Sequence, residues 1–192
     1  MLTFVPQPEG YEALAELCRI TGKLAEVKIP NQVIGGWCSW YYYYTKISEN
    51  EMLSNLEFFK TRKEIPIGLI QMDDGYQTCI GDWGIESDTF NSKFPHGLKW
   101  LVENIHDSGY QAGLWVAPFF TTKKAKHFQE HPQWALRNKN GKFINTLFNW
   151  GAMQYGIDVS QPDALQYAHD IAKTVGHKWG FDFLKIDFLF AA

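Results

Sequence analysis

The sequence predicts an α/β fold built on parallel strands, and two observations lead to this prediction. Four apolar segments lack a regular alternation of polar and apolar residues, which is typical of strands covered on both faces of a parallel sheet. Amphipathic helix patterns with recognisable start signals lie between these segments. Because an alternation of strands and helices fits both a doubly wound sheet and a β/α barrel, the pattern by itself leaves both arrangements open.

The predicted strands are short apolar runs bounded by turn residues. Pro66 is compatible with a strand only because it stands near the start of its segment. The four strands are expected at Gln32–Trp40, Ile65–Asp73, Gln111–Ala117 and Phe181–Phe188.

The predicted helices begin at capping residues. A capping box at Ser48–Glu51 opens a helix toward Thr61, and Gly97–Ser108 forms a second helix. A third runs from Ser160 toward Gly176, with Pro162 in its first turn. Residues 1–30 are expected to form an N-terminal extension with a short helix at 11–20, and residues 31–192 the strand-and-helix domain.

Composition and charge exclude several classes of protein. The chain has 192 residues, of which 45% are hydrophobic and 20% charged, so disorder is excluded. A net charge of −3 argues against a nucleic-acid partner, and no apolar run approaches the roughly 18 residues of a membrane span. The widely spaced Cys18, Cys38 and Cys79, together with the lack of a signal peptide pattern, predict a cytoplasmic location. An aromatic content of 16% fits a sugar-binding cleft or a large aromatic core equally well.

Two adjacent carboxylates, Asp73 and Asp74, end the second predicted strand. Their clustering fits a metal site, the recognition of sugar hydroxyls, or merely an Asp-Gly turn with Gly75. The histidines add little to the metal interpretation. His127 and His131 have helical spacing, but no glutamate follows the first, and both are expected at the surface.

Lys185 and Asp187 lie two residues apart in the last predicted strand, so their side chains are expected on one face. The ammonium group would then favour the ionised form of Asp187 and keep it ready as a nucleophile, unless the pair is only a structural ion pair. Trp40 and Trp83 are candidate walls of a sugar site, whereas Trp37 and Trp115 are expected in the core.

The first strand is followed by neither a GxGxxG nor a P-loop motif, so dinucleotide and nucleotide binding lose their main support. The distinctive polar residues gather at strand ends, which is where a β/α barrel builds its active site. A full barrel takes about 250 residues, and half a barrel would leave open sheet edges. The sequence is therefore expected to be a fragment of a longer enzyme, or a chain completed by self-association or by a missing C-terminal half.

These segments together resemble the melibiase-type α-galactosidases of glycoside hydrolase family 36, from about residue 33 to the C-terminus. The resemblance implies an α/β fold of the (β/α)8 TIM-barrel type, with only about the first four β/α units present. The matching stretches are GWCSWY at 36–41, QMDDGYQ at 71–77, GDW at 81–83, KFPHGLKWL at 93–101, GLWVAPF at 113–119, EHPQWAL at 130–136, DVSQP at 158–162 and LKIDF at 184–188.

The resemblance also implies retaining hydrolysis of terminal α-galactosides through a covalent galactosyl-enzyme intermediate. Asp187 resembles the catalytic nucleophile and Lys185 a lysine that binds the sugar. Asp73 and Asp74 resemble the carboxylate pair that recognises the galactose O4 and O6. Trp40 and Trp83 resemble tryptophans of the same subsite, and no metal or organic cofactor is implied.

Some features depart from the family pattern or leave the reaction open. Leu189 stands where many members carry a polar residue, and the family's acid/base aspartate comes from a strand beyond the fourth. A galactosyltransferase of the raffinose-synthase type would share the same chemistry with another acceptor. A non-catalytic galactoside-binding fragment is the third alternative.

Overall fold

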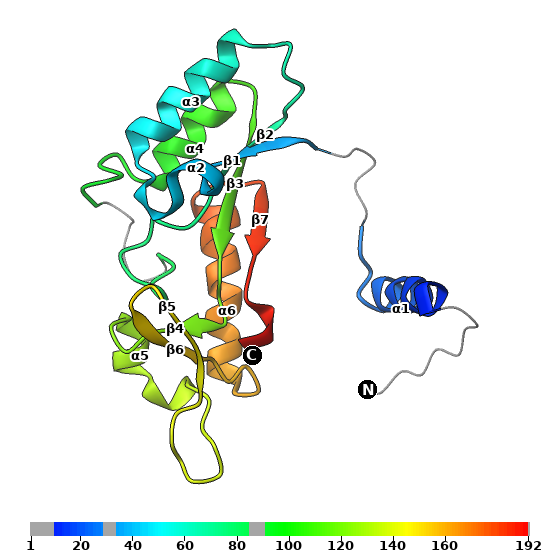
Figure 1. The fold of residues 1–192 in the computed structure, drawn as a ribbon, viewed down its shortest axis with the longest axis vertical. Helices are drawn as coiled ribbons and strands as arrows, with labels where there is room; N and C mark the ends of the chain where they lie inside the picture. Colours follow the sequence, from blue (N-terminus) through cyan, green and yellow to red (C-terminus); the bar gives the residue numbers. More distant parts are fainter. Residues whose placement is uncertain (1–9, 29–33, 85–90, 192) are drawn as a thin grey trace. The chain divides into compact units, whose positions relative to one another are not determined.

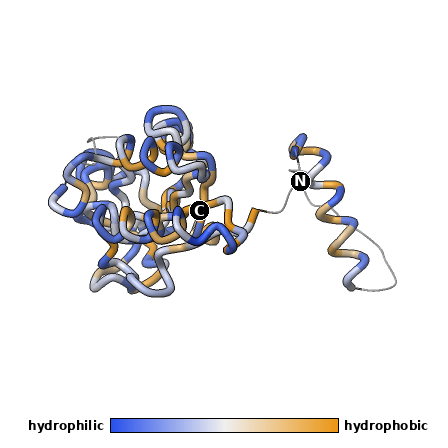
Figure 2. The backbone as a smooth tube through the Cα atoms, turned by 90° about the horizontal axis from the view of Figure 1, so that it is seen from above, coloured by the Kyte–Doolittle hydropathy of each residue, from blue (hydrophilic) through white to orange (hydrophobic). Residues whose placement is uncertain are grey.

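The computed structural model describes residues 10–28, 34–84 and 91–191, and the chain divides into two compact units between Val33 and Ile34. The described part of the first unit is dominated by helix α1 (Gly10–Leu24), which is longer than the helix expected at 11–20. None of its residues is buried within the chain, and Leu14 is 57% exposed. In Figure 2, hydrophobic and hydrophilic residues interchange along the helices, as amphipathic helices require.

The second unit is built on a sheet of four parallel strands (Figure 1). Their spatial order, β1-β2-β3-β7, is also their order along the chain. A doubly wound sheet reverses its strand order at a switch point, whereas neighbouring strands of a β/α barrel follow the chain. The described sheet therefore has the arrangement of the first β/α units of a barrel. The strands are β1 (Gly36–Cys38), β2 (Leu69–Met72), β3 (Gln111–Val116) and β7 (Phe183–Ile186).

Each strand lies inside its predicted segment but is shorter. The first segment was expected to continue to Trp40, yet Trp40 begins the short helix α2 (Trp40–Tyr43), followed by a 3-10 turn η1 (Tyr44–Lys46). Ser39 marks the change, because its N–H still bonds to the sheet at Gln71 while its carbonyl accepts the first helical bond from Tyr43. The last strand ends at Ile186, before the predicted Phe188, and a 3-10 turn η4 (Leu189–Ala191) follows it.

Three longer helices connect the strands: α3 (Glu49–Thr61), α4 (Leu98–Asp107) and α6 (Pro162–Lys173), the last continued by a π-helical turn η3 (Thr174–Lys178). They confirm the three helices expected from the capping signals. The predicted capping box is not formed, because the Ser48 side chain makes no capping bond to the helix backbone and its hydroxyl bonds to the Glu51 carboxylate instead. The buried faces of these helices and the sheet share one hydrophobic core, which includes Leu56, Leu101 and Ile171.

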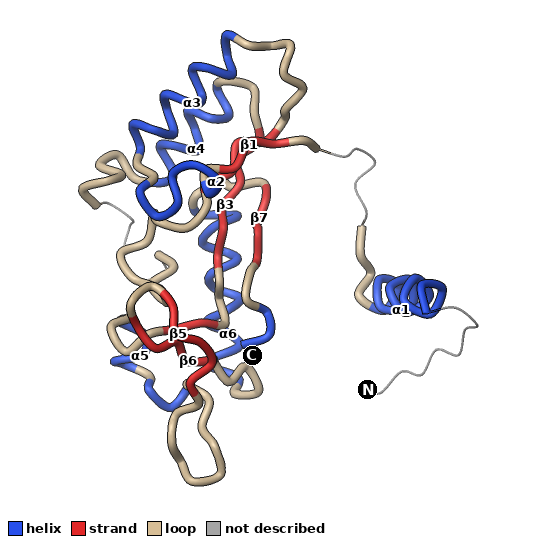
Figure 3. Tube along the Cα trace, viewed as in Figure 1, coloured by secondary structure: helices blue, strands red, loops and turns tan. Residues whose placement is uncertain are grey.

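Along the chain, the segment from β3 to α6 contains a second, antiparallel sheet that was not expected (Figure 3). Its order is β4 (Phe120–Thr121), β6 (Ala152–Gly156), β5 (Asn145–Asn149), and the helical turns α5 (Lys126–Glu130) and η2 (Pro132–Trp134) precede the hairpin. Trp150 and Gly151 form the two-residue hairpin turn, with φ values of 51° and 68°. Asn-Gly and Asp-Gly are the usual sequence signals of such a turn, and a Trp-Gly pair does not predict it.

No helix in the described part of the chain is long and apolar enough to cross a membrane.

Candidate active site

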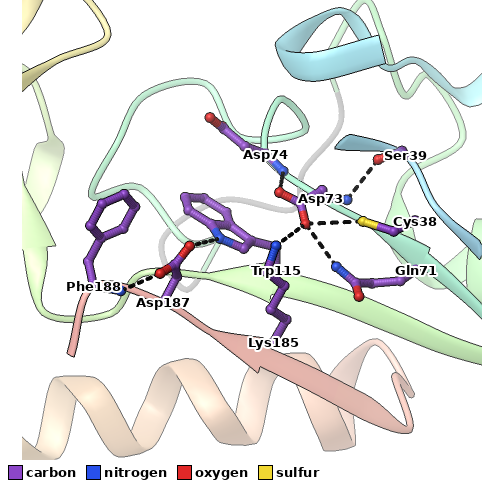
Figure 4. A network of polar contacts seen from close by, with 9 residues as sticks. All are labelled: Cys38, Ser39, Gln71, Asp73, Asp74, Trp115, Lys185, Asp187 and Phe188. Atoms are coloured by element: carbon purple, nitrogen blue, oxygen red, sulfur yellow. Dashed lines mark hydrogen bonds and ion pairs between the residues drawn. The ribbon is translucent and has the colours of Figure 1, made fainter. Parts of the chain in front are cut away.

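The candidate site lies at the carboxyl ends of the parallel strands (Figure 4). Asp73 and Asp74 directly follow β2, and Asp187 directly follows β7. Parallel pairing of β2 and β7 with the intervening β3 brings these ends to one edge of the sheet. The Asp187 N–H donates to the Val116 carbonyl at 2.9 Å, which continues the β3–β7 ladder up to the candidate nucleophile.

Asp73 is buried and accepts hydrogen bonds from side chains of three strands. Its Oδ2 accepts from Lys185 Nζ at 2.8 Å, from Gln71 Nε2 at 2.8 Å and from the Cys38 thiol at 3.4 Å. Its own N–H donates to the Ser39 hydroxyl at 2.9 Å. The donors fix both the position and the rotation of this carboxylate, as a hydroxyl-recognition site requires.

Lys185 pairs with Asp73, and this corrects the expected pairing with Asp187. The two atoms Lys185 Nζ and Asp73 Oδ2 are 2.8 Å apart, whereas the attraction between Lys185 and Asp187 is a minor influence. Burial works against the charge of Lys185, but the hydrogen bond to Asp73 and its charge outweigh burial and raise the pKa of Lys185. The lysine therefore interacts with Asp73 more strongly than with the candidate nucleophile Asp187.

Asp74 turns away from this group toward a separate cavity. Its Oδ1 accepts from Gln77 Nε2 at 2.5 Å and its Oδ2 from Trp150 Nε1 at 2.6 Å. Burial raises the pKa of Asp74, and the two hydrogen bonds partly offset this effect. The cavity beside the carboxylate has a volume of about 400 Å³.

Asp187 is half-buried, and each of its carboxylate oxygens accepts one hydrogen bond. Trp115 Nε1 donates to Oδ2 at 3.1 Å, and the Phe188 backbone N–H donates to Oδ1 at 2.8 Å. Phe188 has a φ of 54°, which is strained for a bulky residue. The two donors hold both carboxylate oxygens in place at the end of β7.

The two candidate tryptophans differ in position. Trp40 is half-buried at the end of β1, and its ring lies 5.2 Å from that of Tyr44, so it is at the expected edge of the sheet. Trp83 is 0% exposed and packs edge-on against Trp115 with the ring centroids 5.5 Å apart. Trp83 is thus buried among core residues, and a wall of the sugar site at this position stays a prediction.

Two tryptophans that bond to the carboxylates were not predicted. Trp115 is buried as expected for a core residue, but it also donates to Asp187. Trp115 pairs with Lys185 in the parallel register of β3 and β7. This pairing puts its side chain on the same face as Lys185 and Asp187, and it is the feature that could have indicated a contact with the site. Trp150 had no such signal, because the hairpin that presents it was not recognised. Other contacts that were not predicted come from Cys38, Ser39, Gln71 and Gln77.

His127 corrects another expectation, since it is buried with 1% exposure and not at the surface. Its Nδ1 lies 3.1 Å from the Tyr167 hydroxyl, and burial lowers the pKa of His127 to about 4. His131 is half-buried and stacks on Trp134. Among the residues that the structure describes, no three His, Cys, Asp or Glu side chains form a group that could hold a metal ion.

Fold and site together define a parallel β/α unit with carboxylates gathered at the carboxyl ends of its strands. The family model described as Melibiase matches residues 15–189, and the chain belongs to this family.

Known relatives are similar over most of this chain. The α-galactosidase TtGalA from Thermus thermophilus, solved in complex with p-nitrophenyl α-D-galactopyranoside, has a TM-score of 0.78 and 36% identity over 86% of this chain and 33% of its own. The α-galactosidase AgaA of Geobacillus stearothermophilus is 27% identical over 142 residues, 70% of this chain and 17% of the relative. An α-galactosidase from Lactobacillus brevis, with 21% identity and a TM-score of 0.68, is similar in fold. The chain thus spans a third or less of the length of these proteins.

Proposed function

We propose that the chain contributes the nucleophile and the sugar-recognition carboxylates of a retaining α-galactosidase. The observation that supports this best is the cluster at the sheet edge. A half-buried Asp187 with a donor on each oxygen stands beside an Asp73–Lys185 pair, in a chain of the melibiase family. Residues 31–192 are the proposed catalytic portion, and residues 1–30 an extension to it.

In the proposed reaction, a carboxylate oxygen of Asp187 attacks the anomeric carbon of a terminal α-galactoside. The bond from this carbon to the glycosidic oxygen breaks, and a general acid protonates the departing oxygen. Water then releases galactose and restores the carboxylate of Asp187, so the anomeric configuration is retained. We place the acid/base carboxyl group in a part of the enzyme beyond these residues, as the greater length of the relatives supports.

Asp73, Asp74 and Lys185 are the proposed hydroxyl-binding groups, and Trp40 the ring that packs on the sugar. The two carboxylates have fixed orientations, so they would accept only hydroxyls that arrive in matching directions. An equatorial O4 would leave a buried acceptor without its partner, which costs about 1–3 kcal/mol. We leave Trp83 out of this set because it has no exposed surface.

An apolar groove between α6 and β7 supports the proposal that further structure covers this edge. It has a volume of about 230 Å³, and its lining includes Leu165, Ile186 and Leu189, which are 44%, 48% and 59% exposed. In a barrel, the next β/α unit covers this face. Self-association is the alternative, and the cytoplasmic location stays a prediction from the sequence.

The test is the intact mass of the chain after incubation with a 5-fluoro-α-galactosyl fluoride. Fluoride leaves without help from an acid, and the ring fluorine slows hydrolysis of the intermediate. We expect a single adduct that maps to Asp187 and is lost in Asp187→Asn. The matched control is Asp170→Asn, which removes a half-buried carboxylate of α6 and should keep the adduct. A folded chain without an adduct, or an adduct that survives Asp187→Asn, would contradict the proposal.

A further inference from the structure

We propose that Trp150 is a positioning residue for sugar recognition: its indole N–H fixes the Asp74 carboxylate, and its ring forms a wall of the cavity beside it. This inference rests on the proposed function, because it assumes that Asp74 binds a sugar hydroxyl. It assigns a specificity-determining role to the β5–β6 hairpin, which carries none of the predicted site residues.

The hairpin turn places Trp150 at some conformational cost. Trp150 has a φ of 51°, a left-handed conformation that is unfavourable for a residue with a side chain. Its backbone N–H donates to the Asn149 side-chain oxygen at 2.9 Å, which supports the turn. A glycine would adopt this conformation without strain, so the presence of a tryptophan here indicates that its side chain has a use.

The side chain of Trp150 connects the two groups of carboxylates. Its Nε1 donates to Asp74 Oδ2 at 2.6 Å, and its ring meets Phe188 edge-on with the centroids 5.5 Å apart. It also lies 6.5 Å from the ring of Trp115, which donates to Asp187. The hairpin therefore contacts both the recognition carboxylate and the aromatic residues around the candidate nucleophile.

The cavity beside Asp74 has the lining that a hydroxylated ring requires. Asp74 and Gln77 offer acceptors and donors, Lys93 and Lys124 contribute positive charge, and Trp150 contributes an aromatic surface. Polar groups for orientation with one aromatic wall favour a sugar over an apolar ligand. At about 400 Å³, the volume lies in the usual range of small-molecule sites.

Because hydrogen bonds hold the Asp74 carboxylate in one orientation, it can accept substrate hydroxyls from certain directions only. A carboxylate offers about four lone-pair directions, and Trp150 and Gln77 occupy one on each oxygen. The remaining directions can serve a substrate hydroxyl only while the carboxylate is kept from rotating. Loss of the indole N–H would free this rotation, so the preference for galactose over its O4 epimer should decline more than the affinity for sugars in general.

Two variants separate the two functions of Trp150. Trp150→Phe keeps an aromatic ring and removes the N–H donor, whereas Trp150→Gln keeps a donor and removes the ring. Trp100→Phe is the control, since Trp100 is half-buried and stacks on His96 in a different part of the fold. The readouts are NMR titrations with methyl α-galactoside and methyl α-glucoside, and the indole N–H resonance of Trp150.

We expect Trp150→Phe to weaken methyl α-galactoside binding at least tenfold, the range for a hydrogen bond to a charged group, with little change for the glucoside. Trp150→Gln should weaken both sugars but restore part of the preference. Equal losses for both sugars in Trp150→Phe would overturn the specificity role.

The indole resonance separates a failure of this inference from a failure of the proposed function. It should move in Asp74→Asn, with no sugar present. If it does not move, the link between Trp150 and Asp74 is refuted. If it moves but the wild-type chain binds neither sugar, the proposed function fails, and the sugar-positioning role with it.

Discussion

Acid should destabilise this chain through His127, which is buried in its neutral form. The ring is 1% exposed and packs on Tyr167, and among the described residues its Nε2 has no hydrogen-bond partner. The pKa of His127 is about 4 in the folded chain, against 6.5 for the unperturbed group. Because the unfolded chain binds the proton more readily, stability falls as the pH drops from about 6.5 to about 4.

The magnitude follows from the difference between the two pKa values, 6.5 − 4 = 2.5. At about 1.4 kcal/mol for each tenfold change in proton affinity, complete protonation removes roughly 3 kcal/mol from the free energy of unfolding. At pH 5 the unfolded state is almost fully protonated at this residue and the folded state about one tenth. The loss there is about 2 kcal/mol.

The assay is urea unfolding at several pH values between 7.5 and 4, for the wild type and for His127→Gln, which does not titrate. The carboxylates titrate in both proteins, so the difference between the two stability curves isolates His127. This difference should change by about 2 kcal/mol between pH 7.5 and pH 5. The control is His169→Gln, at an exposed position of α6, which tests for a general effect of replacing a histidine. Parallel curves for the wild type and His127→Gln would refute the reasoning.

Three substitutions test other contacts. Gly81→Ala should lower the melting temperature markedly, because Gly81 has a φ of 109° and an added Cβ would lie 2.7 Å from the Cβ of Ala125; an unchanged melting temperature would contradict this geometry. Trp115→Phe should slow adduct formation with the 5-fluoro sugar about tenfold by removing a donor to Asp187, and an equal rate would show that the hydrogen bond has no influence. Lys185→Met should abolish detectable binding of methyl α-galactoside in an NMR titration while circular dichroism stays native; retained affinity would exclude the lysine from recognition.

The parallel core of the fold could be predicted because its signals are local. Apolar runs without alternation marked the four strands, and capping residues such as Ser48 marked the helices. The antiparallel sheet could not be predicted in this way. Its strands have two to five residues, and its turn uses Trp150 where asparagine or aspartate is usual.

The candidate site could be predicted in its residues but not in its pairings. Period-two alternation placed Lys185 beside Asp187 on one face, but the reach of a lysine side chain took its ammonium group to Asp73, over the neighbouring strand. The burial of Trp83 and His127 depends on what packs around them, which motif and spacing do not reveal. For the same reason, the indole donors to the carboxylates became visible only in three dimensions.

The ion pair between Lys185 and Asp73 joins two strands, β7 and β2, that share no backbone hydrogen bond, since β3 lies between them. About 110 residues of chain separate the two partners, so the contact is among the most non-local in the fold. During folding, Asp73 can gain its ammonium partner only after the fourth parallel strand has docked. Intermediates with β1, β2 and β3 alone would carry a carboxylate without its counter-charge. The proposed sugar-recognition group would therefore be completed late, when the strand that precedes the proposed nucleophile docks.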